Sequence, residues 1–200
     1  MSPTPSSLSS SKSRAELDAL VAEARSEALQ FEAEIERWQA CLPDAGPVSM
    51  TYLAEDFRES ASLPESRVKE LTAGALALCK AKEYESALTL LGRAALADPQ
   101  PARWFMLARC MQKAGQLSEA AGLYWQVSVG CDHRNAAALC GLGECLERLQ
   151  NPRDAAIAYQ KSLKLKGAGQ GACPPGVLAR AEAGLRRLQP QQSPTIEKEA

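Results

Sequence analysis

The sequence predicts an all-α fold, in which three pairs of antiparallel helices stack into a right-handed superhelix between an N-terminal helical extension and a C-terminal capping helix. Apolar residues recur at helical spacing through most of the chain, which indicates amphipathic helices. Three small residues also return at intervals of 33 and 35 residues, and each is followed four positions later by a bulky one; they are Ala87, Ala120 and Ala155, followed by Leu91, Tyr124 and Tyr159. With 200 residues, of which 46% are hydrophobic, the chain can bury a core of ordinary domain size.

The first element is an amphipathic helix expected over residues 14–41, after a Ser- and Pro-rich stretch, residues 1–13, that is predicted to be a disordered tail. Its apolar residues alternate at spacings of four and three, which is a heptad seam; they are Leu17, Val21, Ala24, Ala28, Phe31, Ile35 and Trp38. Such a stripe needs a partner surface. It pairs either with another helix, which predicts a possible homodimer through residues 14–41, or with its own domain.

Prolines and a glycine interrupt the helical pattern next, so residues 42–65 are interpreted as a linker with a short helix. The repeat domain is expected over residues 66–189. A glycine-rich stretch with a Pro-Pro pair, residues 166–177, precedes a last helix over 177–188 whose apolar side would close the stack. Residues 190–200 are predicted to form a second disordered tail.

An interval near 34 residues with two helices per unit is typical of the tetratricopeptide repeat, and this chain resembles that repeat at the positions that determine its packing. The three units run over about 68–100, 101–134 and 136–169. Paired helices approach closely only where side chains are small, so Ala87, Ala120 and Ala155 are expected at the helix crossings, with Gly115 in a turn. Cys110 and Cys145 occupy equivalent places in the second and third units and are interpreted as small core residues.

The first helix of each pair lines the inner face of such a stack, and residues there that packing does not use are the candidates for binding. We expect the partner-binding groove to be formed by Thr72, Leu76, Cys79, Phe105, Met106, Arg109, Gln112, Lys113, Cys140 and Glu144. Leu76, Phe105 and Met106 would anchor an extended peptide through apolar contacts. Arg109 and Lys113 would hold its carbonyl groups or acidic side chains. Alternatively, the acidic N-terminal helix or a second copy covers this face.

One stretch carries a narrower resemblance: a Leu-Pro lead-in at Leu63 and Pro64, a Tyr-Glu-x-Ala turn beginning at Tyr84, and the segment LARCMQKAGQLSEAAGLY. Over about residues 60–166 the chain resembles the class II chaperones of bacterial type III secretion, the LcrH/SycD group. The resemblance implies an all-helical chaperone of the bacterial cytoplasm that holds a hydrophobic translocator subunit, or another export substrate, in its concave groove. Two other interpretations remain open: a general scaffold or adaptor joining cytosolic proteins, and a structural protein that self-associates through its N-terminal helix.

Composition argues against several other functions. The 23 basic and 24 acidic residues nearly cancel, so the charge does not indicate nucleic-acid binding. The single histidine, His133, cannot supply a catalytic triad, and Glu144 and Glu147 at a spacing of three are typical of a solvated helix face; the chain is therefore predicted not to be an enzyme. The seven cysteines form no CxxC pair, so neither a metal nor a cofactor is expected, and no apolar run is long enough for direct membrane insertion.

Overall fold

The computed structural model describes residues 12–41, 62–130, 135–165 and 175–188, and these residues form eight α-helices. The all-α class is confirmed for this part of the chain. The chain divides between Asp98 and Pro99 into two compact units. The repeat domain that the sequence predicts over 66–189 therefore contributes to both units, and each unit is described by itself below.

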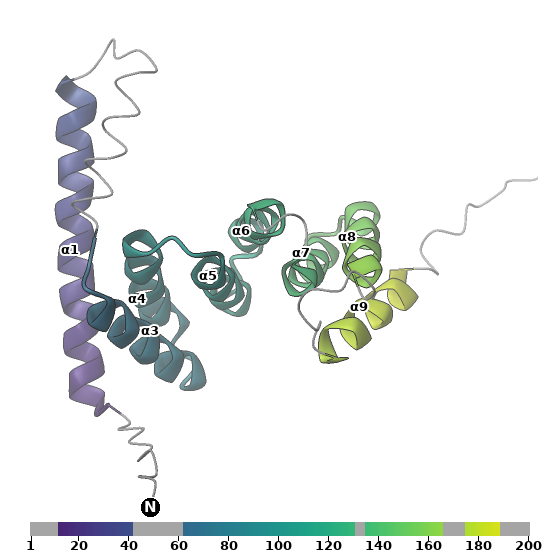
Figure 1. Ribbon diagram of the computed structural model, residues 1–200, viewed down its shortest axis with the longest axis horizontal. Coiled ribbons are helices and arrows are strands. Elements are labelled where there is room, and N and C mark those ends of the chain that lie inside the picture. Colours follow the sequence, from purple (N-terminus) through teal and green to yellow (C-terminus); the bar gives the residue numbers. More distant parts are fainter. Residues whose placement is uncertain (1–11, 42–61, 131–134, 166–174, 189–200) are drawn as a thin grey trace, which may run out of the picture. The chain divides into compact units, whose positions relative to one another are not determined.

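The first unit contains α1 (Arg14–Cys41), α3 (Glu65–Lys80) and α4 (Tyr84–Ala97), shown in purple to blue in Figure 1. α3 and α4 form the first helix pair, and α1 packs against both of them. The contact is apolar at its centre, where Leu17 and Leu20 of α1 lie against Gly74 of α3; a methyl group on Gly74 would come within 2.8 Å of the Leu20 side chain. The small residue in α3 thus makes room for α1.

Ion pairs flank this apolar contact along α1. Lys12 lies 2.6 Å from Glu70, and Arg14 pairs with Glu83. Farther along, Glu23 pairs with Arg67, and Glu27 pairs with Arg93, whose side chain is buried. The first half of α1 is therefore docked on its own unit.

The heptad interpretation of α1 is only partly right. The buried residues are Leu17, Leu20, Val21 and Ala24, a set spaced i, i+3, i+4, i+7, which is the face of a helix packed on a domain. The seam residue Ala28 is exposed, as is Leu29 at 66%. The seam positions Phe31, Ile35 and Trp38 lie outside the described side chains, so a homodimer through residues 14–41 stays a prediction.

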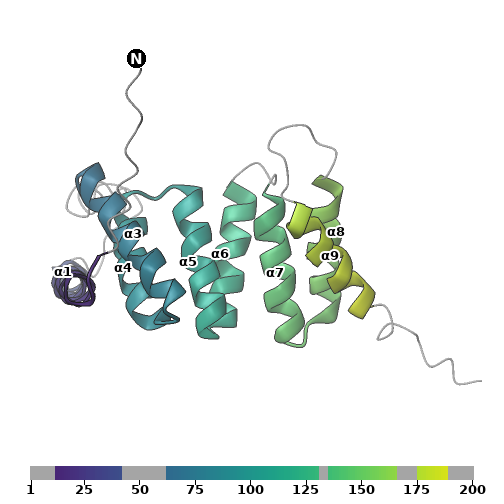
Figure 2. The same ribbon diagram turned by 90° about the horizontal axis from the view of Figure 1, so that it is seen from below.

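The second unit contains α5 (Pro101–Ala114), α6 (Leu117–Gly130), α7 (Ala136–Arg148), α8 (Pro152–Lys164) and α9 (Pro175–Leu188). α5 pairs with α6 and α7 with α8, while α6 contacts α7 and α9 contacts both α7 and α8. Figure 2 shows α5 to α8 side by side as rods of similar length. In Figure 1, α6 and α8 lie on one side of this unit, and α5, α7 and α9 lie on the other.

The turns inside the three helix pairs share one backbone conformation. Lys82, Gly115 and Gln150 follow the first helix of their pairs, and all three have positive φ, at 63°, 90° and 59°. Each turn also closes with the same type of long backbone hydrogen bond, for example from the amide of Gln116 to the carbonyl of Met111 at 3.0 Å. Only Gly115 indicates a positive φ from its residue type. The structure shows that Lys82 and Gln150 adopt the same conformation, so the three turns are equivalent.

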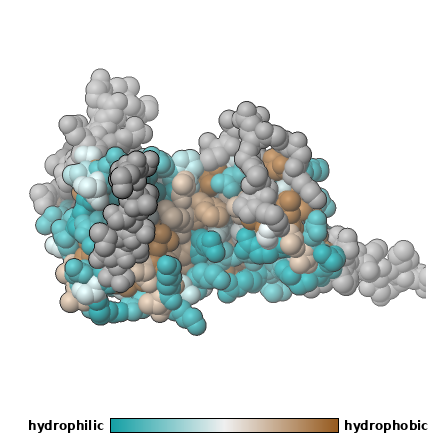
Figure 3. Space-filling model, turned by 60° about the horizontal axis from the view of Figure 1, so that its bottom comes forward, coloured by the Kyte–Doolittle hydropathy of each residue, from teal (hydrophilic) through white to brown (hydrophobic). Residues whose placement is uncertain are grey.

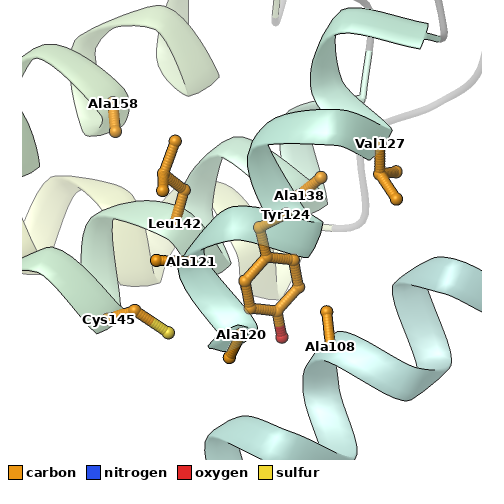
Figure 4. Close-up of a cluster of buried hydrophobic side chains, with 9 residues drawn as sticks. All are labelled: Ala108, Ala120, Ala121, Tyr124, Val127, Ala138, Leu142, Cys145 and Ala158. Carbon is orange, nitrogen blue, oxygen red and sulfur yellow. The ribbon is translucent and has the colours of Figure 1, made fainter. Parts of the chain in front are cut away.

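The residues expected at the helix crossings are all fully buried: Ala87, Ala120 and Ala155 have no exposed surface. Cys110 and Cys145 are buried as well, which confirms their interpretation as core residues. In the second unit, Tyr124 of α6 is the largest side chain of a buried cluster, and Figure 4 shows its ring beside Ala108 of α5. A methyl group on Gly141 of α7 would lie 2.6 Å from that ring, so Tyr124 fills the space between successive helix pairs.

Tyr159 of α8 repeats this arrangement one pair later. Methyl groups on Gly143 of α7 and on Gly184 of α9 would lie 2.7 Å and 2.4 Å from its ring. Gly184 therefore meets Tyr159 as Gly141 meets Tyr124. The helix predicted over 177–188 to close the stack is α9, and it occupies the place that the first helix of a further pair would take.

Some predictions fall on residues that the structure does not describe. These are nearly all of the tail predicted over 1–13, most of the linker expected over 42–65, and the tail expected over 190–200. The same holds for residues 131–134 and 166–174 within the repeat domain.

Candidate functional site

The second unit carries a hollow of about 720 Å³ on the side where α5, α7 and α9 lie. All three helices contribute polar or charged residues to its lining: Gln112 of α5; Glu144, Glu147 and Arg148 of α7; Arg180 and Arg187 of α9. Figure 3 is turned toward this side of the unit and shows hydrophilic surface next to smaller hydrophobic areas. The hollow is the candidate site, and we call it the inner hollow.

One wall of the inner hollow is fixed by a chain of hydrogen bonds across three helices. The Tyr124 hydroxyl donates to Gln112 Oε1 at 2.9 Å, and Gln112 Nε2 donates to Glu144 Oε2 at 2.9 Å. Burial and the nearby carboxylate of Glu144 raise the pKa of Tyr124, so the phenol stays protonated and remains a donor. These two hydrogen bonds therefore orient the side chains of Gln112 and Glu144.

A second, equivalent chain of hydrogen bonds fixes the other wall. The Tyr159 hydroxyl donates to Glu147 Oε2 at 2.8 Å, and Arg187 donates to both oxygens of Glu147, from Nε at 2.7 Å and from Nη2 at 2.9 Å. Glu147 holds the repeat position of Gln112, and Arg187 holds that of Glu144. Because Arg187 and Tyr159 both donate to the charged form, the pKa of Glu147 lies below its ordinary value.

In each ion pair of the inner hollow, the carboxylate is more buried and the guanidinium group is more exposed to solvent. Arg187 is 57% exposed while its partner Glu147 is 23% exposed. Arg180 lies 3.5 Å from Glu144 and shows the same asymmetry, with exposures of 52% and 24%. Arg148 is also exposed, and it donates from Nη1 to the carbonyl of Gln112 at 3.4 Å. A ligand that enters the inner hollow therefore meets guanidinium groups first.

The structure brings together part of the groove predicted from sequence. In the second unit, Arg109 and Lys113 are exposed on α5, and Met106 is half-buried. Phe105 is half-buried too, but its ring packs against Tyr124 with centroids 5.7 Å apart, so part of its surface already belongs to the core. Gln112 and Glu144 line the inner hollow as expected from sequence.

Cys140 does not lie on an open surface. It is fully buried where α9 covers α7, and its thiol lies 3.6 Å from the carbonyl of Val177, to which it donates. The expectation that Cys140 faces a partner is therefore not met, because it assumed that the first helices keep their inner faces free. The capping helix α9 uses that face of α7.

The first unit holds the other three predicted groove residues, all on α3. Leu76 is 46% exposed, Cys79 is half-buried, and the Thr72 hydroxyl donates to the carbonyl of Val68 at 2.8 Å. α1 lies in the same unit but packs at Gly74, and it leaves Leu76 exposed. In the first unit, therefore, the acidic N-terminal helix does not cover Leu76.

The predicted groove set omits eight of the ten residues that line the inner hollow, and the charged ones among these eight are Glu147, Arg148, Arg180 and Arg187. The available signal was the repeat register, because Glu147 and Arg148 hold the positions of Gln112 and Lys113, which were both chosen. Arg180 and Arg187 could not be found in this way. Their helix follows a longer connection, and its register to the repeat becomes visible only through the contact of Gly184 with Tyr159.

Two classes of site do not occur in the part of the chain that the structure describes. No three His, Cys, Asp or Glu side chains come together there in a way that could hold a metal ion. In the same residues, no helix has both the length and the hydrophobicity that crossing a bilayer requires.

Comparison with known proteins gives a result at the level of structure alone. No family model matches the chain, and no curated protein matches its sequence. Among solved structures, the tetratricopeptide-repeat domain of Sgt2 from Aspergillus fumigatus is 22% identical, with a TM-score of 0.54 over 66% of this chain and 82% of that one.

Type III secretion chaperones are similar to the chain to the same degree. PcrH from Pseudomonas aeruginosa is 19% identical, with a TM-score of 0.58 over 64% of this chain and 96% of that one. The Yersinia enterocolitica chaperone SycD, solved with a peptide of the translocator YopD, is 18% identical, with a TM-score of 0.57 over 65% and 98%. At these identities the likeness establishes the fold, which is that of the tetratricopeptide repeat.

Proposed function

We propose that this chain is a non-catalytic, peptide-binding chaperone of bacterial type III secretion, which acts in the cytoplasm and holds a hydrophobic segment of a translocator or another export substrate. The observation that carries the proposal is that, in each unit taken by itself, packing leaves part of the apolar side-chain surface of a first helix exposed. Leu76 is 46% exposed on α3, and Met106 and Phe105 are half-buried on α5. The fold supports it too, because SycD was solved with a translocator peptide.

The energy available from these side chains suits a transient complex. Full burial of a Leu side chain contributes about 1.5–3 kcal/mol, so covering the exposed part of Leu76 is worth roughly 1 kcal/mol, or about fivefold in affinity. Several such contacts are needed, since an extended segment loses conformational entropy when it binds. A chaperone must also release its substrate, and a set of modest contacts meets that requirement.

The experiment uses the full chain and a fluorescein-labelled peptide of the translocator YopD, followed by fluorescence anisotropy. Leu76→Ser should weaken binding about fivefold. Leu96→Ser is the matched control, because Leu96 is 42% exposed in the same unit but lies on α4. An equal loss in both variants, or no saturable binding of the peptide, would contradict the proposal.

A general tetratricopeptide adaptor that joins two cytosolic proteins is the second candidate. It is favoured by the charged residues that line the inner hollow, because they suit a hydrophilic segment better than a membrane-inserting one. Coexpression with a hydrophobic translocator separates the two functions. The chaperone function requires that the translocator become soluble only when this chain is present, whereas an adaptor leaves its solubility unchanged.

A further inference from the structure

We infer that the inner hollow selects an acidic segment of the partner, with Asp or Glu side chains set between Arg148, Arg180 and Arg187. This inference rests on the proposed peptide-binding function and names the chemistry of one part of the bound segment. It concerns the second unit alone, where α7 and α9 supply all three guanidinium groups.

The first step is the difference in exposure between the carboxylates and the arginines of the inner hollow. Both carboxylates of the inner hollow, Glu144 and Glu147, are less than a quarter exposed, and each lies beneath an arginine that is more than half exposed. Each guanidinium has five N–H donors in a fixed fork, and one carboxylate below it cannot use them all. The outward donors of Arg180 and Arg187 remain available to a ligand.

The second step is the balance of charge. The lining of the inner hollow sets three arginines, Arg148, Arg180 and Arg187, against the two carboxylates of Glu144 and Glu147, an excess of one positive charge. A basic or neutral segment would leave this excess uncompensated, whereas an acidic one neutralises it.

The third step is preorganisation. Glu147 is held by Tyr159, and Glu144 is linked through Gln112 to Tyr124, so the anions beneath the arginines are fixed from inside the fold. A fixed carboxylate orients the arginine above it, which lowers the entropy that the arginine loses when it binds a ligand. The hydrogen-bonded tyrosines therefore act as positioning residues for the cationic rim.

The test uses the full chain and three fluorescein-labelled decapeptides, in which Ser alternates with Glu, with Gln or with Lys. Anisotropy titrations at low salt should show the Glu peptide binding at least about tenfold more tightly than the Gln peptide, and the Lys peptide not binding. Raising the salt should weaken the Glu peptide selectively, because exposed charge pairs are screened. Equal affinities for the Glu and Gln peptides would overturn the inference.

The matched variants locate the effect. Arg148→Gln with Arg180→Gln should weaken the Glu peptide about tenfold, while Arg153→Gln with Lys161→Gln should change it less than about twofold. The control pair removes two exposed cations from α8 of the same unit, away from the inner hollow. Thermal unfolding followed by circular dichroism should be unchanged in both, since exposed ion pairs contribute little to stability.

Three outcomes separate this inference from the proposed function. If the YopD peptide binds and depends on Leu76 while the Glu peptide does not bind, the acidic selection is wrong and the chaperone function stands. If neither peptide binds, both fall. If a ten-nucleotide oligothymidylate displaces the Glu peptide at equal concentration, the rim recognises phosphates as well as carboxylates and the assignment to an acidic protein segment is overturned.

Discussion

Gly184 offers the sharpest test of how the stack ends. A methyl group at this position would lie 2.4 Å from Cε2 and Cζ of Tyr159, whereas carbon atoms in contact are normally about 3.5–4 Å apart. Gly184→Ala therefore requires a displacement of about 1 Å. The ring has little room to move away, because Gly143 lies beside its opposite edge, where a methyl group would be 2.7 Å from Cδ1 and Cε1.

The size of the effect follows from two opposing terms. Overpacking a filled core destabilises by about 1–3 kcal/mol, and the tight contact here favours the upper half of that range. Replacing a glycine inside a helix by alanine recovers up to about 1 kcal/mol. Gly184→Ala should thus lower the free energy of unfolding of the second unit by about 1–2 kcal/mol, mostly by loosening α9.

Gly122→Ala is the matched control, since Gly122 lies inside α6 with no atom within 4 Å of a methyl group. It should stabilise by about 0.5–1 kcal/mol through helix propensity alone. Urea unfolding gives the free energies, and hydrogen exchange of the α9 amides reports whether that helix loosens. If Gly184→Ala is as stable as Gly122→Ala and the protection of α9 is unchanged, Tyr159 is not held between the two helices.

Three further predictions concern single groups. Gln150→Gly should raise the unfolding free energy by about 0.5–1 kcal/mol in a urea titration, because glycine adopts positive φ without the steric cost that Gln150 bears at 59°; an unchanged or lower value would argue against strain in this turn. The pKa of Glu147 is held below its ordinary value by Arg187, so its stabilising effect is complete above the unfolded pKa and is lost as pH falls through the folded pKa. Glu147→Gln should therefore flatten the acid side of the melting-temperature profile, whereas an acid limb identical to that of the parent chain would refute this origin. Burial raises the pKa of Cys145 to about 11, so iodoacetamide at pH 8 should label half-buried Cys79 well before Cys145 when peptides are mapped by mass spectrometry; labelling in the reverse order would contradict the burial.

The helix pairs could be predicted because their cause is local and repeated. Close approach of two helices demands small residues at fixed intervals, so Ala87, Ala120 and Ala155 could be assigned from spacing alone, and they are fully buried. The same holds for Cys110 and Cys145, which are small enough for the same environment. The type of turn was visible at Gly115 only, since Lys82 and Gln150 adopt the same conformation against their usual preference.

The placement of the terminal helix in each unit could not be predicted equally well, because it depends on which of two similar faces that helix uses. For α1 a seam spaced by four and three fitted the sequence, and only the contact with Gly74 shows that Leu20 belongs to the buried face. For α9 the apolar side was visible, but its register was not.

That register determines the chemistry of the inner hollow. With Gly184 against Tyr159, Arg187 lies over Glu147 and Arg180 lies within 3.5 Å of Glu144. A shift of α9 by one residue would turn these side chains by about 100° around the helix axis and separate both pairs. Glu144 and Glu147, which appear in the sequence as an ordinary solvated face, become the base of a cationic rim only because an uncharged contact between a glycine and a tyrosine sets the position of α9.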